Sequence, residues 1–411
     1  MASDSLVFRY FWIFGLINNV LYVVILSAAA DIVGPGLPKA LVLLLDILPA
    51  FVLKLTAPFF IHKSAHRHRI AVLIGLSCVG MVLVAGRKLS ACVAGIILAS
   101  LSSGLGELTF LQLTHYYQQP GLNGWSSGTG GAGLFGSGMY MLLTSILKVP
   151  VNLSLLLFSV LPFAFLLYFR LDKQQHMYAN VENDYASAGF DFTSSTTETE
   201  MPVDDSASAP HIERNKWTAM KSHVSGTLLR IKGLVVPYML PLSVVYLFEY
   251  MINQGVSPTL LFPLDEKHSH PFFFHKYRDI YVTYGTLYQL GVFISRSSGS
   301  LLQIRRLYIL AILQGLNLAL AISQSWFYVV RSVYPVMFLI FFEGLLGGAS
   351  YVHTFKNIIH DVDISEREFS LGAVSMSDSF GVLLAAFAGI ALEPRLCSHQ
   401  VDTGRPWCLK E

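Results

Sequence analysis

Long apolar runs separated by short polar breaks constrain this sequence more than any other feature. A helical run of about 20 apolar residues matches the hydrocarbon thickness of a bilayer. Such runs lie near 8–30, 38–61, 70–86, 91–113, 127–147, 150–170, 238–260, 280–295, 306–324, 333–355 and 369–392. They are continuous rather than alternating, which is typical of helices and not of barrel strands. The sequence therefore predicts an all-α polytopic membrane protein with about eleven transmembrane helices.

Composition agrees with a membrane protein and narrows its function. Charged residues make up 13% of the chain and hydrophobic residues 53%, where a soluble domain has about 25% charged residues. The net charge of +2 is small, and Lys and Arg are spread along the loops, so we expect no nucleic-acid partner. No catalytic triad, paired-carboxylate or metal-ligand spacing appears. We therefore expect no enzyme activity, no cofactor and no metal site.

A polar segment divides the apolar runs into two groups. Residues 172–232 are rich in Ser, Thr, Asp and Glu, which predicts a disordered loop. The Lys and Arg bias of the loops, with this segment included, places the segment and the N-terminus in the cytoplasm. The division leaves residues 1–171 with about six spans and residues 233–411 with about five. Two helical halves joined by a long cytoplasmic loop are typical of major-facilitator transporters.

Carboxylates within the apolar runs indicate a functional cavity. Glu249 lies in the run 244–255, where a charge costs about 3 kcal/mol or more unless it faces a partner or water. Asn253 follows four residues later on the same helical face, so the two side chains could form one polar site. Glu107 and Glu343 would line the cavity if the halves are related; helix-packing hydrogen bonds are the alternative. The segment 15–19 resembles 250–254, so its two asparagines, Asn18 and Asn19, are further candidates for the cavity. The candidate translocation cavity comprises Glu249, Asn253, Glu107, Glu343, Asn18 and Asn19.

Four further charged residues suggest ion pairs or a gate. Asp46 and Lys54 share one apolar run and can pair with each other or with other helices. Arg296 and Asp378 lie near the ends of spans, where a gate, an inter-helix salt bridge or snorkelling to the interface would each explain them.

The glycine-rich segment 128–133 matches a dinucleotide-binding fingerprint but opens a membrane span. That fingerprint requires a strand before it and a helix after it, so nucleotide binding is not expected. Small residues in a membrane helix instead allow close approach to a neighbouring helix. The alternative is a helix that flexes or slides during transport.

Shorter signals concern location and redox state. Tyr178 and Val181 fit a tyrosine-based sorting pattern shortly after a span, which predicts cytoplasmic sorting adaptors as partners. Cys397 and Cys408 could form a disulfide if their side of the membrane is oxidising.

Several motifs, in the same order along almost the whole chain, resemble those of the battenin family of lysosomal membrane proteins. The motifs are Asn18-Asn19 with 22–29, 46–49, 102–107, 126–133, Glu249-Tyr250 with 252–255, 295–298 and 351–355. Residues 408–411 occupy the position of the family's prenylation box, but Lys410 and Glu411 make a poor prenylation site.

The resemblance implies residence in lysosomes and late endosomes. It also implies support of lysosomal pH homeostasis, transport of basic amino acids such as arginine, and clearance of glycerophosphodiesters. Two interpretations stay open. The chain is a secondary transporter of a small solute, with protons as a candidate coupling ion, or a transport regulator, as its intramembrane carboxylates favour. The other interpretation is a scaffold in the bilayer that organises endosome–lysosome trafficking.

Overall fold

The computed structural model describes residues 4–33, 39–86, 88–171, 216–264, 270–272 and 274–409. Within these ranges the chain forms helices and short connections and contains no β-strand, which confirms the all-α prediction. The candidate sorting residues Tyr178 and Val181 lie outside the described residues, as do positions 172–215 of the predicted loop.

The N-terminal half is built around one long, bent helix. Its helices are α1 (Asp4–Val33), α2 (Lys39–Thr56), α3 (His66–Ala85), α4 (Leu89–Met141) and α5 (Val151–Phe158). Within α4, Gln118 has non-helical backbone angles (φ 48°, ψ −136°) and Pro120 follows two residues later. Proline lacks an N–H and clashes with the preceding turn, so the helix breaks there into two arms.

Contacts with α1 show that the two arms of α4 run in opposite directions. On the first arm, Phe110 stacks on Phe14 and Tyr117 packs on Phe11, so this arm is antiparallel to α1. The second arm runs parallel to α1, because Gly124 lies against Phe8 and Gly136 against Val23. The helix α4 is therefore a hairpin, and its arms contain the spans predicted near 91–113 and 127–147.

The C-terminal half forms a second bundle. Its helices are α7 (Lys216–Leu234), α8 (Leu240–Tyr250), α9 (Tyr277–Ser297), α10 (Leu307–Phe327), α11 (Val333–Asp361), α12 (Ile364–Val374) and α13 (Met376–Asp402). The predicted disorder of residues 172–232 does not extend to 216–232, which are helical. These residues are helical because α7 continues without a break, through a π-helical turn (Val235–Met239), into the membrane helix α8.

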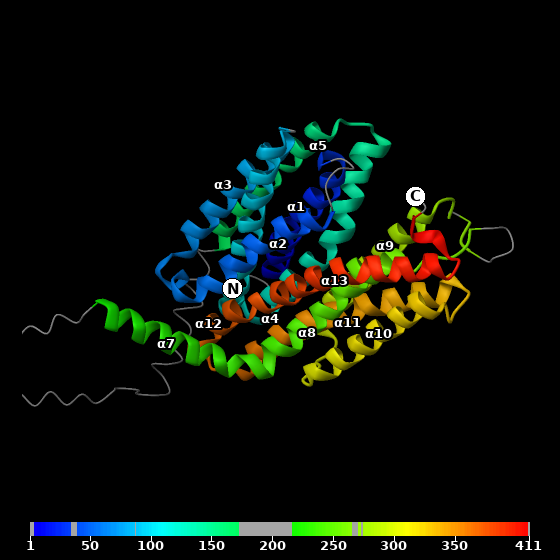
Figure 1. The fold of residues 1–411 in the computed structure, drawn as a ribbon. Coiled ribbons are helices and arrows are strands. Elements are labelled where there is room, and N and C mark those ends of the chain that lie inside the picture. The colour runs from blue at the N-terminus through cyan, green and yellow to red at the C-terminus, as the bar shows by residue number, and fades with distance from the viewer. Residues whose placement is uncertain are drawn as a thin grey trace, which may run out of the picture.

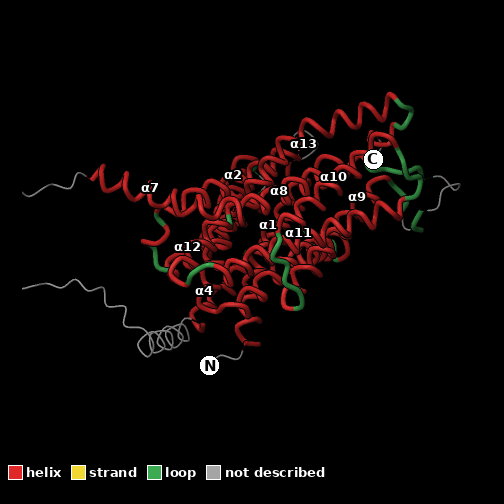
Figure 2. The backbone as a smooth tube through the Cα atoms, turned by 90° about the horizontal axis from the view of Figure 1, so that it is seen from below, coloured by secondary structure: helices red, strands yellow, loops and turns green. Residues whose placement is uncertain are grey.

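The two halves lie side by side and share a core. Figure 1 shows α1, α2, α3 and α5 on one side and α8, α9, α10, α11 and α13 on the other, and Figure 2, seen from below, shows α7 projecting from one end of the molecule. The helix α2 packs on α13, and α4 packs on α9 and α11. Buried aromatic residues from both halves, including Phe110, Trp125, Tyr246 and Phe355, belong to one hydrophobic cluster.

In the described part of the chain, seven segments are long and apolar enough to cross a membrane. One of them, Ser90–Thr144, has 55 residues and covers both arms of α4. The chain is therefore a polytopic helical membrane protein. The figure of about eleven spans stays a prediction.

Glycines bring helices into backbone contact within each half. A Cβ atom at Gly128 would lie 2.1 Å from the carbonyl oxygen of Trp12 on α1, and one at Gly344 of α11 would lie 2.2 Å from that of Tyr288 on α9. Such distances leave no room for any side chain. A Cβ at Gly133 would meet the side chain of Gln289 in the other half at 2.0 Å. The glycine-rich segment therefore acts in helix packing, both inside its half and across to α9.

Candidate functional site: a polar cavity between the halves

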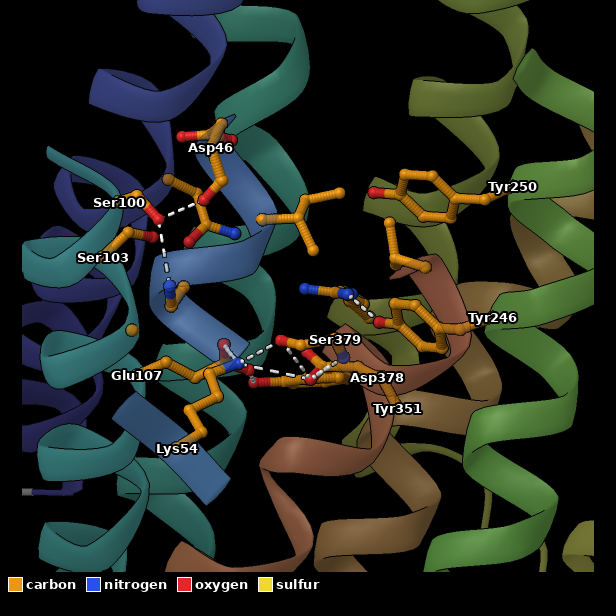
Figure 3. Close-up of a pocket in the computed structure, with 16 residues that line it drawn as sticks. Asp46, Lys54, Ser100, Ser103, Glu107, Tyr246, Tyr250, Tyr351, Asp378 and Ser379 are labelled. Carbon is orange, nitrogen blue, oxygen red and sulfur yellow. Dashed lines mark hydrogen bonds and ion pairs between the residues drawn. The ribbon is translucent and has the colours of Figure 1, made fainter. Parts of the chain in front are cut away.

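A cavity of about 130 Å³ lies between the two halves. Figure 3 shows side chains from both halves pointing into it. The N-terminal half supplies Asn19, Asp46, Ile47, Ala50, Lys54, Ser100, Ser103, Gly104 and Glu107. The C-terminal half supplies Tyr246, Tyr250, Arg296, Tyr351, Asp378, Ser379 and Val382. The lining is mostly polar, although the surrounding helices are apolar.

Lys54 joins three helices at this cavity. Its Nζ lies 3.2 Å from Oδ1 of Asp378 on α13 and 2.9 Å from Oγ of Ser379, and it also pairs with Glu107 on the first arm of α4. The side chain of Lys54 is only 2% exposed. A buried ammonium ion without such partners would be very costly. The pairing of Lys54 is with other helices, one from each half, and its ion pairs do not include Asp46.

Tyr351 extends this network into both halves. Its hydroxyl donates to Oε1 of Glu107 at 2.9 Å and accepts a hydrogen bond from Nε1 of Trp125 at 3.0 Å. Trp125 lies on the second arm of α4, whereas Tyr351 lies on α11. Glu107 is therefore held by a lysine from its own half and a tyrosine from the other.

Arg296 faces the cavity from α9 without a carboxylate at ion-pair distance among the described residues. Its guanidinium donates to Oγ1 of Thr129 at 2.8 Å and to the hydroxyl of Tyr246 at 2.7 Å. The guanidinium carbon also lies 4.0 Å from the ring centroid of Tyr351, a cation–π contact. Thr129 belongs to the N-terminal half, so Arg296 links the halves through neutral partners and keeps its full positive charge.

The other N-terminal candidates lie beside the cavity or in its wall. Asp46 and Asn19 line it, and Oδ2 of the buried Asp46 accepts no hydrogen bond in the described part of the chain. Asn18 lies outside the lining. Its amide donates to Oδ1 of Asn19 at 3.2 Å and to the carbonyl oxygen of Ser103 at 3.3 Å, which ties α1 to α4.

Glu249, Asn253 and Glu343 form a separate polar group inside the C-terminal half. Glu249 and Glu343 are 2% and 0% exposed and do not line the cavity. The hydroxyl of Tyr288 donates to Oε1 of Glu249, and Nδ2 of Asn253 donates to Oε1 of Glu343 at 2.9 Å. Asn253 thus pairs with Glu343 rather than Glu249. Its backbone is π-helical (Met251–Val256), and the wider turn rotates it away from the α-helical position.

Sequence reasoning found the neutral residue Asn19 but missed the tyrosines and serines of the cavity. The tyrosines Tyr246, Tyr250 and Tyr351 and the serines Ser100, Ser103 and Ser379 carry no charge and are common in membrane helices. Some signal was present, because Ser379 follows Asp378 and Tyr250 follows Glu249 directly. A polar residue beside an intramembrane carboxylate is a candidate partner for it.

At the C-terminal end, Cys397 and Cys408 form the disulfide that their spacing allowed. It ties α13 to the short helix Pro406–Leu409 that follows.

Solved structures share this fold at low sequence identity. The crystal structure of the human organic anion transporter MFSD10 matches with a TM-score of 0.57 at 14% identity, covering 99% of this chain and 96% of that one. The proton:xylose symporter XylE, described as a major facilitator superfamily protein, matches with a TM-score of 0.59 at 10% identity, covering 98% and 91%. The two-half, major-facilitator-like fold is therefore confirmed.

Sequence comparison identifies the family. The pattern of the CLN3 protein family matches residues 9–399. Protein BTN1 of Eremothecium gossypii is 60% identical over the full length of both chains, and Protein BTN1 of Saccharomyces cerevisiae is 57% identical over 98% of each. Protein btn-1 of Neurospora crassa is 46% identical over 99% of this chain and 92% of its own. The resemblance to battenin is thus confirmed, and this chain belongs to the CLN3 (battenin) protein family.

Proposed function

We propose that this chain is a secondary transporter in which the two halves expose the central cavity alternately to either side of the membrane. The observation that carries the proposal is the buried bridge from Lys54 to Glu107 and Asp378. It spans the two halves of a major-facilitator-like fold at the wall of a polar cavity. A scaffold has no need of a charged cluster there, because apolar residues would pack equally well.

The small size of the cavity supports a cycle in which the cavity widens to admit solute. Pockets that bind small molecules usually measure about 300–1,000 Å³, whereas this cavity measures about 130 Å³. A solute larger than a few water molecules enters only after the halves separate. The bridge of Lys54 must break for that to happen, and the bound solute replaces the lost contacts.

The charges in the cavity suit the solutes that the family resemblance implies. Glu107, Asp378 and Asp46 offer carboxylates to a cationic group such as that of arginine, and Arg296 offers a guanidinium to the phosphate of a glycerophosphodiester. We propose these two classes as substrates, with protons as the coupling ion. Export of either from lysosomes and late endosomes would link the protein to lysosomal pH homeostasis.

Uptake into vesicles tests the transport proposal. The full chain is reconstituted, a pH gradient is imposed, and the entry of radiolabelled arginine and of a labelled glycerophosphodiester is measured separately. We expect gradient-dependent, saturable uptake of at least one solute. Arg296→Gln keeps a hydrogen-bonding side chain but removes the charge. It should therefore reduce uptake of the phosphodiester more strongly than uptake of arginine.

A control variant and a negative outcome complete this test. Arg230→Gln removes a charge from an exposed ion pair with Glu366, neither of which lines the cavity, and should leave uptake unchanged. If correctly folded protein moves neither solute under any gradient, the transporter proposal fails in favour of a regulator or a trafficking scaffold.

A further inference from the structure

We propose that Glu249 and Glu343, together with the amide of Gln314, form a second site inside the C-terminal half that binds a proton apart from the solute cavity. Neither carboxylate lines the cavity, although Glu249 lies on α8 directly beside Tyr250, which does. Glu249 is therefore the neighbour in sequence of a residue that lines the cavity. The existence of this site does not depend on the proposed transport function; only its role in coupling proton binding to solute transport does.

The first step is that the two carboxyl groups are neighbours. A Cβ at Gly347 would lie 2.2 Å from Oε2 of Glu249, so this carboxyl group rests on the backbone of α11 at that glycine. Glu343 lies four residues earlier on the same helix, and side chains at that spacing stand about 5–6 Å apart on one face. The absence of a side chain at Gly347 is what admits Glu249 to this position.

The second step is that neither carboxylate has a cation at ion-pair distance. Each carboxylate accepts one hydrogen bond through Oε1, whereas Oε2 of both has no partner in the described part of the chain. No lysine or arginine of the described residues lies within ion-pair distance of either. Two buried carboxylates this close cannot both hold a negative charge at acceptable cost, so at least one must bind a cation.

Gln314 provides an independent indication of a ligand. It is 0% exposed, and neither its amide oxygen nor its amide nitrogen has a partner among the described residues. It lies on the face of α10 that also buries Leu310 and Asn317. A buried amide without a hydrogen-bond partner lowers the stability of the fold by about 1–3 kcal/mol. We therefore expect a ligand or another state of the protein to provide its partner.

The packing of α10 places Gln314 at the level of the two carboxylates. Leu310 packs with Leu346 of α11, and Nδ2 of Asn317 lies 3.4 Å from the carbonyl oxygen of Leu339. The helices are therefore antiparallel, and Gln314 lies level with Glu343. On the other side, Gly315 contacts the ring of Phe248, the residue before Glu249.

The chemistry of the open atoms favours a proton over a metal ion. Three oxygen atoms are unpaired, namely Oε2 of the two glutamates and Oε1 of Gln314. Calcium takes 6–8 oxygen ligands and magnesium needs an octahedron, so three oxygens are too few. A proton needs only one carboxylate to bind it and one further oxygen to accept the new hydrogen bond. That acceptor is the second carboxylate or the amide.

Other titratable groups lie around Glu249. Tyr288 and Arg296 lie on α9, and Tyr246 and Tyr250 lie on α8, the helix of Glu249 itself. The hydroxyl of Tyr288 already donates to Glu249, whereas Arg296 acts only through space. A displacement of Arg296 by solute in the cavity would weaken this stabilisation of the negative charge on Glu249. Solute binding and proton binding would therefore be linked through one guanidinium.

Infrared spectroscopy of the purified full chain tests the proposal without any transport measurement. A protonated carboxyl group has a C=O stretching band that a carboxylate lacks. We expect such a band at neutral pH in the wild type, and it should shift to lower frequency when glutamate is labelled with ¹³C at the side-chain carboxyl. A band that does not respond to glutamate labelling overturns the proposal before any residue is changed.

Substitutions then assign the band. The double variant Glu249→Gln with Glu343→Gln, which keeps size and hydrogen bonding, should lose it, and Gln314→Leu should shift its frequency. Asp46→Asn and the exposed Glu366→Gln should leave it unchanged. Persistence of the band in a folded double variant overturns the proposal. So does an increase in melting temperature with sodium ions that the wild type shows and the double variant lacks. If the double variant loses the band and the wild type takes up no solute, the proton site is retained and the transporter proposal is rejected.

Discussion

Nζ of Lys54 and Oδ1 of Asp378 lie 3.2 Å apart although 324 positions separate them in the chain. They belong to α2 and α13, the helices through which the two halves pack on each other near the cavity. In the proposed transport cycle, an ion pair of this kind serves as a reversible connection. It is strong while buried and dry, and it weakens as soon as water enters between the halves.

Replacing Lys54 tests the importance of this connection. In Lys54→Met, Glu107 and Asp378 are left buried without their cation, so we expect a loss of about 3–5 kcal/mol in the free energy of unfolding. Thermal unfolding of the purified protein in detergent measures the change. The exposed pair Arg230–Glu366 provides the control, since Arg230→Ala should cost about 1 kcal/mol or less.

A combined variant separates charge from packing at the same place. Lys54→Met together with Glu107→Gln and Asp378→Asn removes all three charges and should recover most of the lost stability. If Lys54→Met alone is no less stable than Arg230→Ala, the bridge does not hold the halves together.

The glycine contact between α1 and α4 predicts a position that tolerates no side chain. Gly128→Ala would place a methyl group 2.1 Å from the carbonyl oxygen of Trp12, so the helices must separate, at a cost of about 1–3 kcal/mol. Gly138, near the end of the same arm, has no atom within 4 Å of the point where a Cβ would lie. Gly138→Ala should therefore gain up to about 1 kcal/mol from helix propensity. Equal melting temperatures for the two variants would contradict the packing interpretation.

Transport by Glu249→Gln connects the buried pair to function. The substitution keeps the shape and the hydrogen bond from Tyr288 but cannot bind or release a proton. We expect a folded, correctly located protein whose solute flux is lost or no longer depends on the pH gradient. Asn253→Ala is the matched comparison: it removes a neutral hydrogen-bond donor to Glu343 but leaves both carboxyl groups, so flux should still depend on the pH gradient, with a shifted midpoint. Wild-type flux and pH dependence in Glu249→Gln would assign the coupling to Glu107 or another carboxylate.

Tyr178→Ala tests the proposed sorting signal. We expect part of the protein to move from late endosomes and lysosomes to the cell surface, as seen by fluorescence microscopy and surface biotinylation. Tyr185→Ala is the control, because Tyr185 is followed three residues later by Ala188 and lacks the bulky apolar residue of the pattern. Equal distributions of the two variants would mean that another part of the chain carries the address.

Fold and site differed in how far they could be predicted. Apolar runs of membrane length leave a chain few alternatives to helices, so the all-α, two-half prediction was correct. The intramembrane charges likewise led to Lys54, Glu107 and Asp378. Their pairing could not be predicted, because it depends on which helices become neighbours. The same applies to Asn253, whose partner was decided by a π-helical turn that no sequence pattern announced.

The uncharged residues of the cavity also show that sequence alone does not predict which side chains meet in the folded bundle. Tyr351 accepts from Trp125, donates to Glu107 and stacks under Arg296. The family motif 351–355 includes this residue, yet no charge or spacing in the sequence assigns it a place in the cavity. Its role arises from three helices meeting at one point, which is a property of the assembled bundle.

The disulfide between Cys397 and Cys408 bears on how the chain is made. Thiols are oxidised in the endoplasmic reticulum and not in the cytosol, so we expect the end of α13 to lie on the lumenal side of the membrane. A cytosolic prenyltransferase would then meet neither the correct side of the membrane nor a free thiol at Cys408. In the disulfide-bonded form, Cys408 therefore offers no free thiol for lipidation, and oxidation of this pair and lipidation of Cys408 exclude each other.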